Sequence, residues 1–246
     1  MKKTIYLAGG CFWGMQAYFQ KIQGILSTEC GYANGNTVHP SYEEVCRNNT
    51  GHAETVKIEY EDSVLPLKNL LRYYFRVIDP TSLNKQGNDV GTQYRTGIYY
   101  TEPKDKEGID SVVQKEQKRY DAEILVEVLP LARFDKAEEY HQNYLQKNPA
   151  GYCHIPLELA DEPLLDDEKY QPLSDAELKQ KLNPEEYDVL VNSATDRPFE
   201  NQYWDSMERG LYVDRATGEP LFSSKDKFQS ACGWPSFAKP IAQEAV

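Results

Sequence analysis

The amino-acid sequence predicts a domain of mixed helices and strands, of the α+β or α/β class, over about its first 155 residues. Apolar residues recur at helical spacing in some segments and alternate with polar residues in others, and the two patterns follow one another along the chain. A shorter segment of mainly β character comes later, after an acidic stretch with several prolines. The 246 residues are therefore expected to form two domains.

The first domain begins with a predicted strand at residues 4–8, which Gly9 and Gly10 end. Apolar residues then recur every three or four positions over residues 12–22, which predicts a helix that Gly24 ends. The residue between the glycines and the helix is thus expected at a helix N-terminus.

A second strand and a second helix have equally regular patterns. Residues 53–60 alternate between polar and apolar side chains, which predicts a strand with one buried face. From Leu67 to Ile78 the apolar residues share one stripe, which predicts a helix that ends at Asp79-Pro80. The other expected elements are strands near 96–101 and 123–129 and helices near 107–121 and 136–146.

The predicted boundaries are a first domain at 1–155, a linker at 156–173, which includes the acidic residues 166–168, and a second domain at 174–246. Two short helices, separated by Asn183-Pro184, are expected over residues 174–192. After Gly210, two short apolar runs flank an Ala-Thr-Gly-Glu-Pro turn, which predicts a β-hairpin.

Charge narrows the possible partners. The chain has 27 Lys and Arg against 39 Asp and Glu, a formal charge of -12, and no basic cluster, which argues against binding to nucleic acid or an anionic membrane. No stretch approaches the roughly 18 apolar residues of a membrane span. We expect a cytoplasmic monomer, or a periplasmic or cell-surface protein if a leader has been removed.

The cysteines are odd in number and widely spaced. An odd set without any Cys-x-x-Cys pair predicts neither a disulfide framework nor a structural zinc site, so reactive or buried thiols remain. We assign two of them to packing, and no metal is expected. The five are Cys11, Cys30, Cys46, Cys153 and Cys232, of which Cys30 and Cys46 are the packing pair.

Cys11 follows the glycine turn and opens the first helix. There, free backbone N–H groups and the helix dipole can stabilise a thiolate, and Phe12 and Trp13 can form an apolar pocket beside the sulfur. This position favours a nucleophile; the alternative is an ordinary buried cysteine at the end of a strand.

Glu54 falls on the apolar face of the strand at 53–60. Burial raises the pKa of a carboxyl, so Glu54 is a candidate proton donor near neutral pH, unless it reaches solvent past Gly51. Tyr42 and Tyr94 lie in polar, glycine-bearing segments, where their hydroxyls can donate hydrogen bonds to a substrate oxygen.

Cys153 lies after the last predicted helix of the first domain, in Gly-Tyr-Cys-His. A thiol on a flexible segment can approach a distant sulfenic acid and form a disulfide, although a buried or free surface thiol is the alternative. His141 is interpreted as a histidine on one face of the helix at 136–146.

Six short blocks resemble the methionine sulfoxide reductase A family in the same order: Gly9–Gly14, Gly31–Gly35, Gly51–Glu54, Gly87–Arg95, Tyr140–Gln142 and Gly151–Cys153. The resemblance covers residues 4–155 and implies an α+β fold, a two-layer ferredoxin-like sandwich. It also implies roles for single residues. Cys11 would be the nucleophile, Glu54 the acid, Phe12 and Trp13 the methyl pocket, Tyr42, Asp89 and Tyr94 the oxygen site, and Cys153 the resolving thiol.

Residues from about 174 onward resemble the start of methionine sulfoxide reductase B, most clearly at Asp196–Asn201 and Cys232–Phe237. By this resemblance Cys232 would be a resolving-type cysteine and Trp234 a substrate aromatic. The stretch that holds a zinc Cys-x-x-Cys in many members is Asp214–Thr217 here, so no zinc is implied. The family's nucleophile segment would lie beyond Val246, so we expect a partial second domain, with R-epimer activity only in a longer chain.

The function expected from the whole sequence is thiol-dependent reduction of the S epimer of methionine sulfoxide, free or in oxidised proteins. By resemblance, thioredoxin or a similar dithiol protein is the reductant, and no other cofactor is expected. Two alternatives remain: a general thiol peroxidase, and a non-catalytic binder of oxidised methionine.

Overall fold

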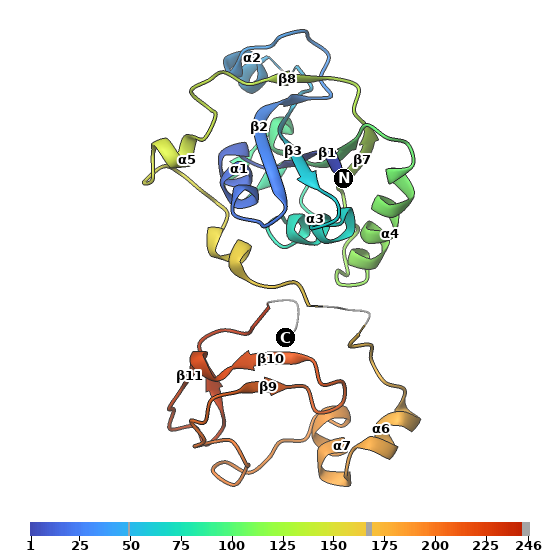
Figure 1. The fold of residues 1–246 in the computed structure, drawn as a ribbon, viewed down its shortest axis with the longest axis vertical. Coiled ribbons are helices and arrows are strands. Elements are labelled where there is room, and N and C mark those ends of the chain that lie inside the picture. Colours follow the sequence, from blue (N-terminus) through green and yellow to red (C-terminus); the bar gives the residue numbers. More distant parts are fainter. Residues whose placement is uncertain (49, 166–168, 243–246) are drawn as a thin grey trace. The chain divides into compact units, whose positions relative to one another are not determined.

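The computed structural model describes residues 1–48, 50–165 and 169–242. The chain divides into two compact units, Met1–Asp161 and Glu162–Val246, and each is described by itself (Figure 1). Residues 166–168 of the predicted linker and 243–246 of the predicted second domain lie outside the described residues. No helix in the described ranges is long and apolar enough to cross a membrane.

A six-stranded mixed sheet forms the centre of the first unit, in the order β7-β6-β1-β3-β2-β8. Neighbouring strands are antiparallel except β6 and β7, which are parallel. The predicted α+β class is confirmed, and the chain order of the central elements is β-α-β-β-α-β. The strands are β1 (Lys2–Gly9), β2 (Ile25–Ala33), β3 (Ala53–Glu61), β6 (Thr96–Tyr100), β7 (Glu127–Pro130) and β8 (Phe134–Lys136).

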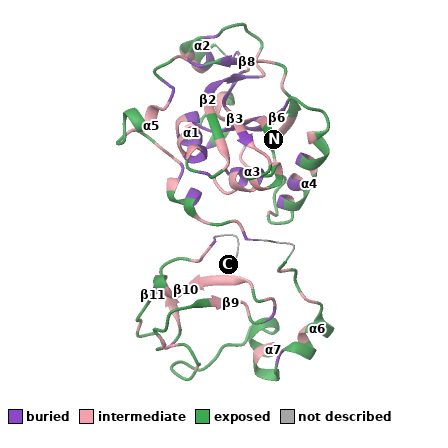
Figure 2. Cartoon of the chain, viewed as in Figure 1, coloured by how far each residue is buried: buried purple, intermediate pink, exposed green. Residues whose placement is uncertain are grey.

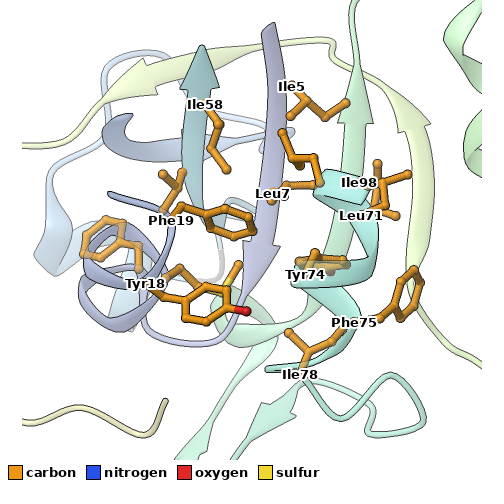
Figure 3. Close-up of a cluster of buried hydrophobic side chains, with 14 of the residues drawn as sticks. Ile5, Leu7, Tyr18, Phe19, Ile58, Leu71, Tyr74, Phe75, Ile78 and Ile98 are labelled. Atoms are coloured by element: carbon orange, nitrogen blue, oxygen red, sulfur yellow. The ribbon is translucent and has the colours of Figure 1, made fainter. Parts of the chain in front are cut away.

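Two helices pack against this sheet and form one hydrophobic core with it (Figure 3). They are α1 (Phe12–Gln20) and α3 (Leu67–Phe75), both expected from their apolar spacing. In α3 the predicted stripe is buried, with Leu71 and Tyr74 fully enclosed. Buried residues accordingly concentrate in the sheet and in the helix faces turned toward it (Figure 2). The core therefore fixes the start of α1 against the ends of β1 and β3.

Further elements surround this core. Most of the predicted helix at 107–121 is found as α4 (Asp105–Gln117). Ser41 and Glu44 form a reciprocal capping box at the start of α2. The others are α2 (Tyr42–Arg47), the hairpin of β4 (Lys85–Gln86) and β5 (Asp89–Val90), and two 3-10 turns, η1 (Thr92–Tyr94) and η2 (Leu157–Asp161).

The predicted helix at 136–146 is wrong. Only α5 (Tyr144–Lys147) is helical there, because Asn143 adopts a left-handed conformation with φ of 54°. The side chain of Gln142 instead bonds to the backbone of Cys30 in β2, accepting from its N–H and donating to its carbonyl, both at 2.9 Å. Tertiary hydrogen bonds thus replace the helical ones over this segment.

The second unit is small, and neither of its helices contains a buried residue. It contains the predicted helix pair and the predicted hairpin, formed by β9 and β10. Capping boxes start both helices, and Pro184 occupies the first turn of the second. Stacked rings of Phe222 and Phe237, with centroids 4.4 Å apart, contribute to its packing. The elements are α6 (Asp175–Lys181), α7 (Pro184–Val191), β9 (Leu211–Val213), β10 (Pro220–Ser223), η3 (Ser224–Asp226), β11 (Lys227–Phe228) and β12 (Ser236–Phe237).

The first part of the predicted linker packs on the first unit. Within η2, Leu159 and Ala160 are buried in the same hydrophobic cluster as α1 and α3. The compact first unit accordingly extends to Asp161.

Candidate active site

Cys11 lies where β1 ends and α1 begins, as the sequence predicts, and it is the N-cap residue of α1. The turn before it requires glycine at position 10, where φ is +79° and a Cβ would come 2.6 Å from the Cβ of Gln86. This tight turn seats the sulfur at the N-terminus of the helix. Cys11 is nevertheless only 7% exposed, so the thiol lies at the bottom of its site.

The thiolate of Cys11 is stabilised less than the sequence predicts. Burial raises the pKa of Cys11 well above its usual range, and the nearby Glu54 raises it further. The backbone N–H groups of Trp13 and Gly14 do lower the pKa, as the helix N-terminus predicts, but by less. The thiol is therefore protonated at neutral pH.

Glu54 is buried on β3, at 1% exposure, and does not reach solvent past Gly51. Its Oε2 accepts a hydrogen bond from the backbone N–H of Phe12 at 3.1 Å, so the carboxyl lies against the first turn of α1. Burial raises the pKa of Glu54 to about 8; the Phe12 N–H lowers it, and Asp89 raises it. At pH 7 most molecules thus hold a neutral, proton-donating carboxyl beside Cys11.

This buried acid should destabilise the fold, which predicts that Glu54→Gln is more stable than the wild type. Between pH 4.5 and 8 the unfolded chain ionises this carboxyl while the folded chain keeps it protonated, so the folded state loses about 1.4 kcal/mol per pH unit. Glutamine can still accept from Phe12 and has no proton to lose. We expect its free energy of unfolding at pH 7 to exceed the wild type's by about 3 kcal/mol.

Urea unfolding at several pH values checks this prediction. The difference between the two proteins should grow as pH rises from 4.5 to 8 and vanish below pH 4.5, where the carboxyl is protonated in both states. A difference that does not change with pH would mean that Glu54 is ionised in the folded protein.

Two tyrosines lie near Glu54 on other elements: Tyr42 is the first residue of α2, and Tyr94 ends η1. Burial raises the pKa of both phenols, and the charge of Glu54 raises it further. Tyr42 also forms hydrogen bonds with Tyr94 and Cys46. Both phenols therefore stay protonated and can donate hydrogen bonds close to the carboxyl.

Aromatic rings form the other side of the site. Phe12 is fully buried, whereas Trp13 is half-buried and stacks on Tyr144, with ring centroids 3.7 Å apart. The indole N–H of Trp13 donates to Nδ1 of His141 at 3.0 Å. His141 was predicted on a helix face, but it lies in a non-helical turn, where it is 1% exposed and its ring lies 4.5 Å from that of Tyr42.

Asp89 and Tyr152 lie close to Cys11 on a further side. The hydroxyl of Tyr152 donates to Oδ2 of Asp89 at 3.1 Å, and the charge of Asp89 raises the pKa of both Cys11 and Glu54. Sequence reasoning missed Tyr152, Tyr144 and the role of His141. Their partners lie more than 60 positions away in the chain, so no local pattern could indicate these contacts.

Cys153 packs on the first turn of α1. A Cβ placed at Gly14 would come 3.1 Å from its sulfur, and Gly14 is three residues from Cys11. Its thiol donates to the carbonyl of Ile155 at 3.2 Å, and both Cys11 and Cys153 are free thiols. The structure therefore brings the two predicted working cysteines to the same helix turn. Cys30 is fully buried, as expected for packing, and Cys46 is half-buried beside Tyr42.

The second unit presents a separate thiol. Cys232 is exposed and makes hydrogen bonds with the hydroxyls of Ser230 at 2.8 Å and Ser236 at 3.4 Å. These two serines, followed by the backbone at Trp234, lower the pKa of Cys232 to about 7. Trp234 is 37% exposed. The resolving role of Cys232 and the substrate-binding role of Trp234 stay predictions.

No group of three or more His, Cys, Asp or Glu residues that could hold a metal ion is found in the described part of the chain. The site in the first unit offers a thiol, a neutral carboxyl and phenolic donors. An aromatic surface lies next to them.

Comparison with known proteins finds matches over both units. Residues 3–172 match the family model of peptide methionine sulfoxide reductase, and residues 182–246 match the SelR domain. The reduced form of Mxr1 from Saccharomyces cerevisiae is 37% identical, with a TM-score of 0.60 over 63% of this chain and 90% of that chain. Methionine sulfoxide reductase A of Corynebacterium diphtheriae is 35% identical, with a TM-score of 0.59 over 62% of this chain and 77% of that chain.

Proposed function

The chain belongs to the peptide methionine sulfoxide reductase family, and from this membership we propose that its first unit reduces the S epimer of methionine sulfoxide through Cys11, Glu54 and Cys153. The observation that carries the proposal is the meeting of a buried thiol and a neutral buried carboxyl at one helix N-terminus, beside phenolic donors and an aromatic surface. The substrate is free methionine sulfoxide or an oxidised methionine in a protein.

In the first step the sulfur of Cys11 attacks the sulfoxide sulfur. Glu54 gives its proton to the sulfoxide oxygen, with Tyr42 and Tyr94 as further hydrogen-bond donors. The oxygen then passes to Cys11, methionine leaves, and the thiol proton of Cys11 returns to Glu54. The sulfoxide sulfur is reduced by two electrons, and the sulfur of Cys11 is oxidised to a sulfenic acid.

A neutral Glu54 and a thiolate at Cys11 favour each other. An ionised Glu54 raises the pKa of Cys11, so the two negative charges oppose one another in the buried site. A neutral Glu54 removes that repulsion. The same proton therefore favours a thiolate at Cys11 and provides the acid that the sulfoxide oxygen needs.

Three fixed directions give the site a handedness. Cys11 sets the line of attack, Glu54 the position of the oxygen, and Phe12 with Trp13 the position of the methyl group. A sulfoxide sulfur is a stereocentre, so only one epimer can satisfy all three and still direct its remaining chain to solvent. Membership of the family favours the S epimer.

In the second step Cys153 attacks the sulfenic acid of Cys11 and forms a disulfide, with loss of water. An external dithiol protein of the thioredoxin kind then attacks this disulfide and restores both thiols. Cys153 is half-buried, and the neighbouring Tyr152 is 42% exposed, so this side of the site is near the surface.

An epimer-resolved assay tests the proposal. Purified protein, with dithiothreitol as reductant, is given each pure epimer of methionine sulfoxide, and methionine is measured by chromatography. A Cys232→Ser background prevents the second unit's thiol from contributing. We expect methionine from the S epimer and none above background from the R epimer. Binding of the S epimer without release of methionine would show a binder rather than a reductase.

A further inference from the structure

His154 is a buried polar side chain that the proposed chemistry leaves unused. Its side chain is 8% exposed, and neither ring nitrogen makes a hydrogen bond of regular length and angle. Nδ1 lies 3.7 Å from Oδ2 of Asp89, and the backbone of Gly9 also faces the ring. Burying a polar group without such bonds costs about 1–3 kcal/mol, so another interaction must hold the imidazole there.

The imidazole fills the space between two glycine turns. A Cβ placed at Gly10 would come 3.0 Å from Nε2 of His154, and one at Gly87 would come 3.3 Å from its Cβ. Gly10 directly precedes Cys11, and Gly87 joins β4 to the strand that begins with Asp89. Close packing therefore acts together with the polar contacts to Asp89 and the Gly9 backbone in holding the ring against the backbone of the catalytic turn.

Three consecutive residues of this segment contact the site. Tyr152 donates to Asp89, the sulfur of Cys153 packs on Gly14, and the ring of His154 packs on Gly10. Cys153 is thus fixed on both sides by its neighbours in the chain.

We propose that His154 is a positioning residue for disulfide formation: its ring anchors residues 152–154 on the Gly10 turn, so that Cys153 stays within reach of Cys11. The inference rests on the proposed function. It concerns only the second step, in which the S–S bond forms while the S–O bond of the sulfenic acid breaks. The hydroxide that leaves takes the thiol proton of Cys153 and becomes water.

The charge state of His154 suits an anchor from which residues 152–154 must later be released. Burial lowers the pKa of His154, although Asp89, the charged group that faces the ring, raises it. The imidazole is therefore neutral at neutral pH and makes no full ion pair with Asp89. A segment that no full ion pair holds can leave the turn when an external dithiol has to reach the disulfide.

Single-turnover experiments on the full chain test this inference. Wild type, His154→Ala and the control His39→Ala are reduced, freed of reductant and mixed with the S epimer. His39 is a suitable control because its side chain is 86% exposed. Methionine release reports the first step, which also consumes the Cys11 thiol; loss of a second free thiol per chain reports the disulfide, and a dimedone adduct at Cys11 reports the sulfenic acid. Cys153→Ser shows the signal for complete loss of the second step.

We expect His154→Ala to release one methionine per chain at the wild-type rate, to form the disulfide about 10- to 100-fold more slowly, and to accumulate the dimedone adduct. His39→Ala should match the wild type in all three measurements. Disulfide formation within twofold of wild type, or an equal slowing of both steps, would overturn the anchor. If the wild type releases no methionine, it is the proposed function itself that fails.

Discussion

Cys11→Ser is expected to lower methionine formation from the S epimer at least about 1,000-fold, because the hydroxyl of serine is a far weaker nucleophile and cannot form a sulfenic acid. The substitution is nearly isosteric, so the packing around the N-cap of α1 should be kept. Steady-state methionine production with dithiothreitol gives the rate.

Cys232→Ser is the matched control, because it makes the same change at a thiol of the second unit. It should keep the full rate with the S epimer. If Cys11→Ser retains more than about a tenth of wild-type activity, another residue is the nucleophile and the proposed mechanism is wrong.

Glu54→Gln is expected to lower methionine formation about 100- to 10,000-fold, the usual contribution of a positioned acid. The amide keeps the hydrogen bond from Phe12 but has no proton to give. In the wild type, activity should fall as pH rises through about 8, because the acid form of Glu54 is lost there. The residual activity of the variant should lack this decrease.

Rates of both proteins between pH 6 and 9.5 check this prediction, with Glu59→Gln as the control. Glu59 lies on the same strand but on its other face, paired with Lys2, and its substitution should leave the rate unchanged. Turnover of peroxide that is insensitive to Glu54→Gln, together with unchanged sulfoxide reduction, would favour a general thiol peroxidase.

The positions of Cys11 and Glu54 could be predicted because short-range patterns place them. A strand, a glycine turn and a helix follow one another within twenty residues and locate Cys11 at a helix N-terminus. Alternation along one strand places Glu54 on the buried face. Both patterns need only the geometry of single elements.

What the sequence could not predict depends on distant contacts. The raised pKa of Cys11 follows from its burial and from Glu54 on another strand, which outweigh the local effect of the helix N-terminus. Strand β2 was missed because polar residues interrupt its apolar pattern, and it is held by pairing with β3. The helix expected at 136–146 was wrong because the side chain of Gln142 bonds to that same strand.

The packing of Cys153 on the first turn of α1 also links catalysis to resistance against unfolding. A bond between Cys11 and Cys153 would close a covalent loop around almost the entire first unit. Loops of that length restrict an unfolded chain by roughly 4–5 kcal/mol in the chain-entropy account. Each turnover would then pass through a cross-linked enzyme with a higher free energy of unfolding. The reductant that restores activity would also return the free energy of unfolding to its lower value.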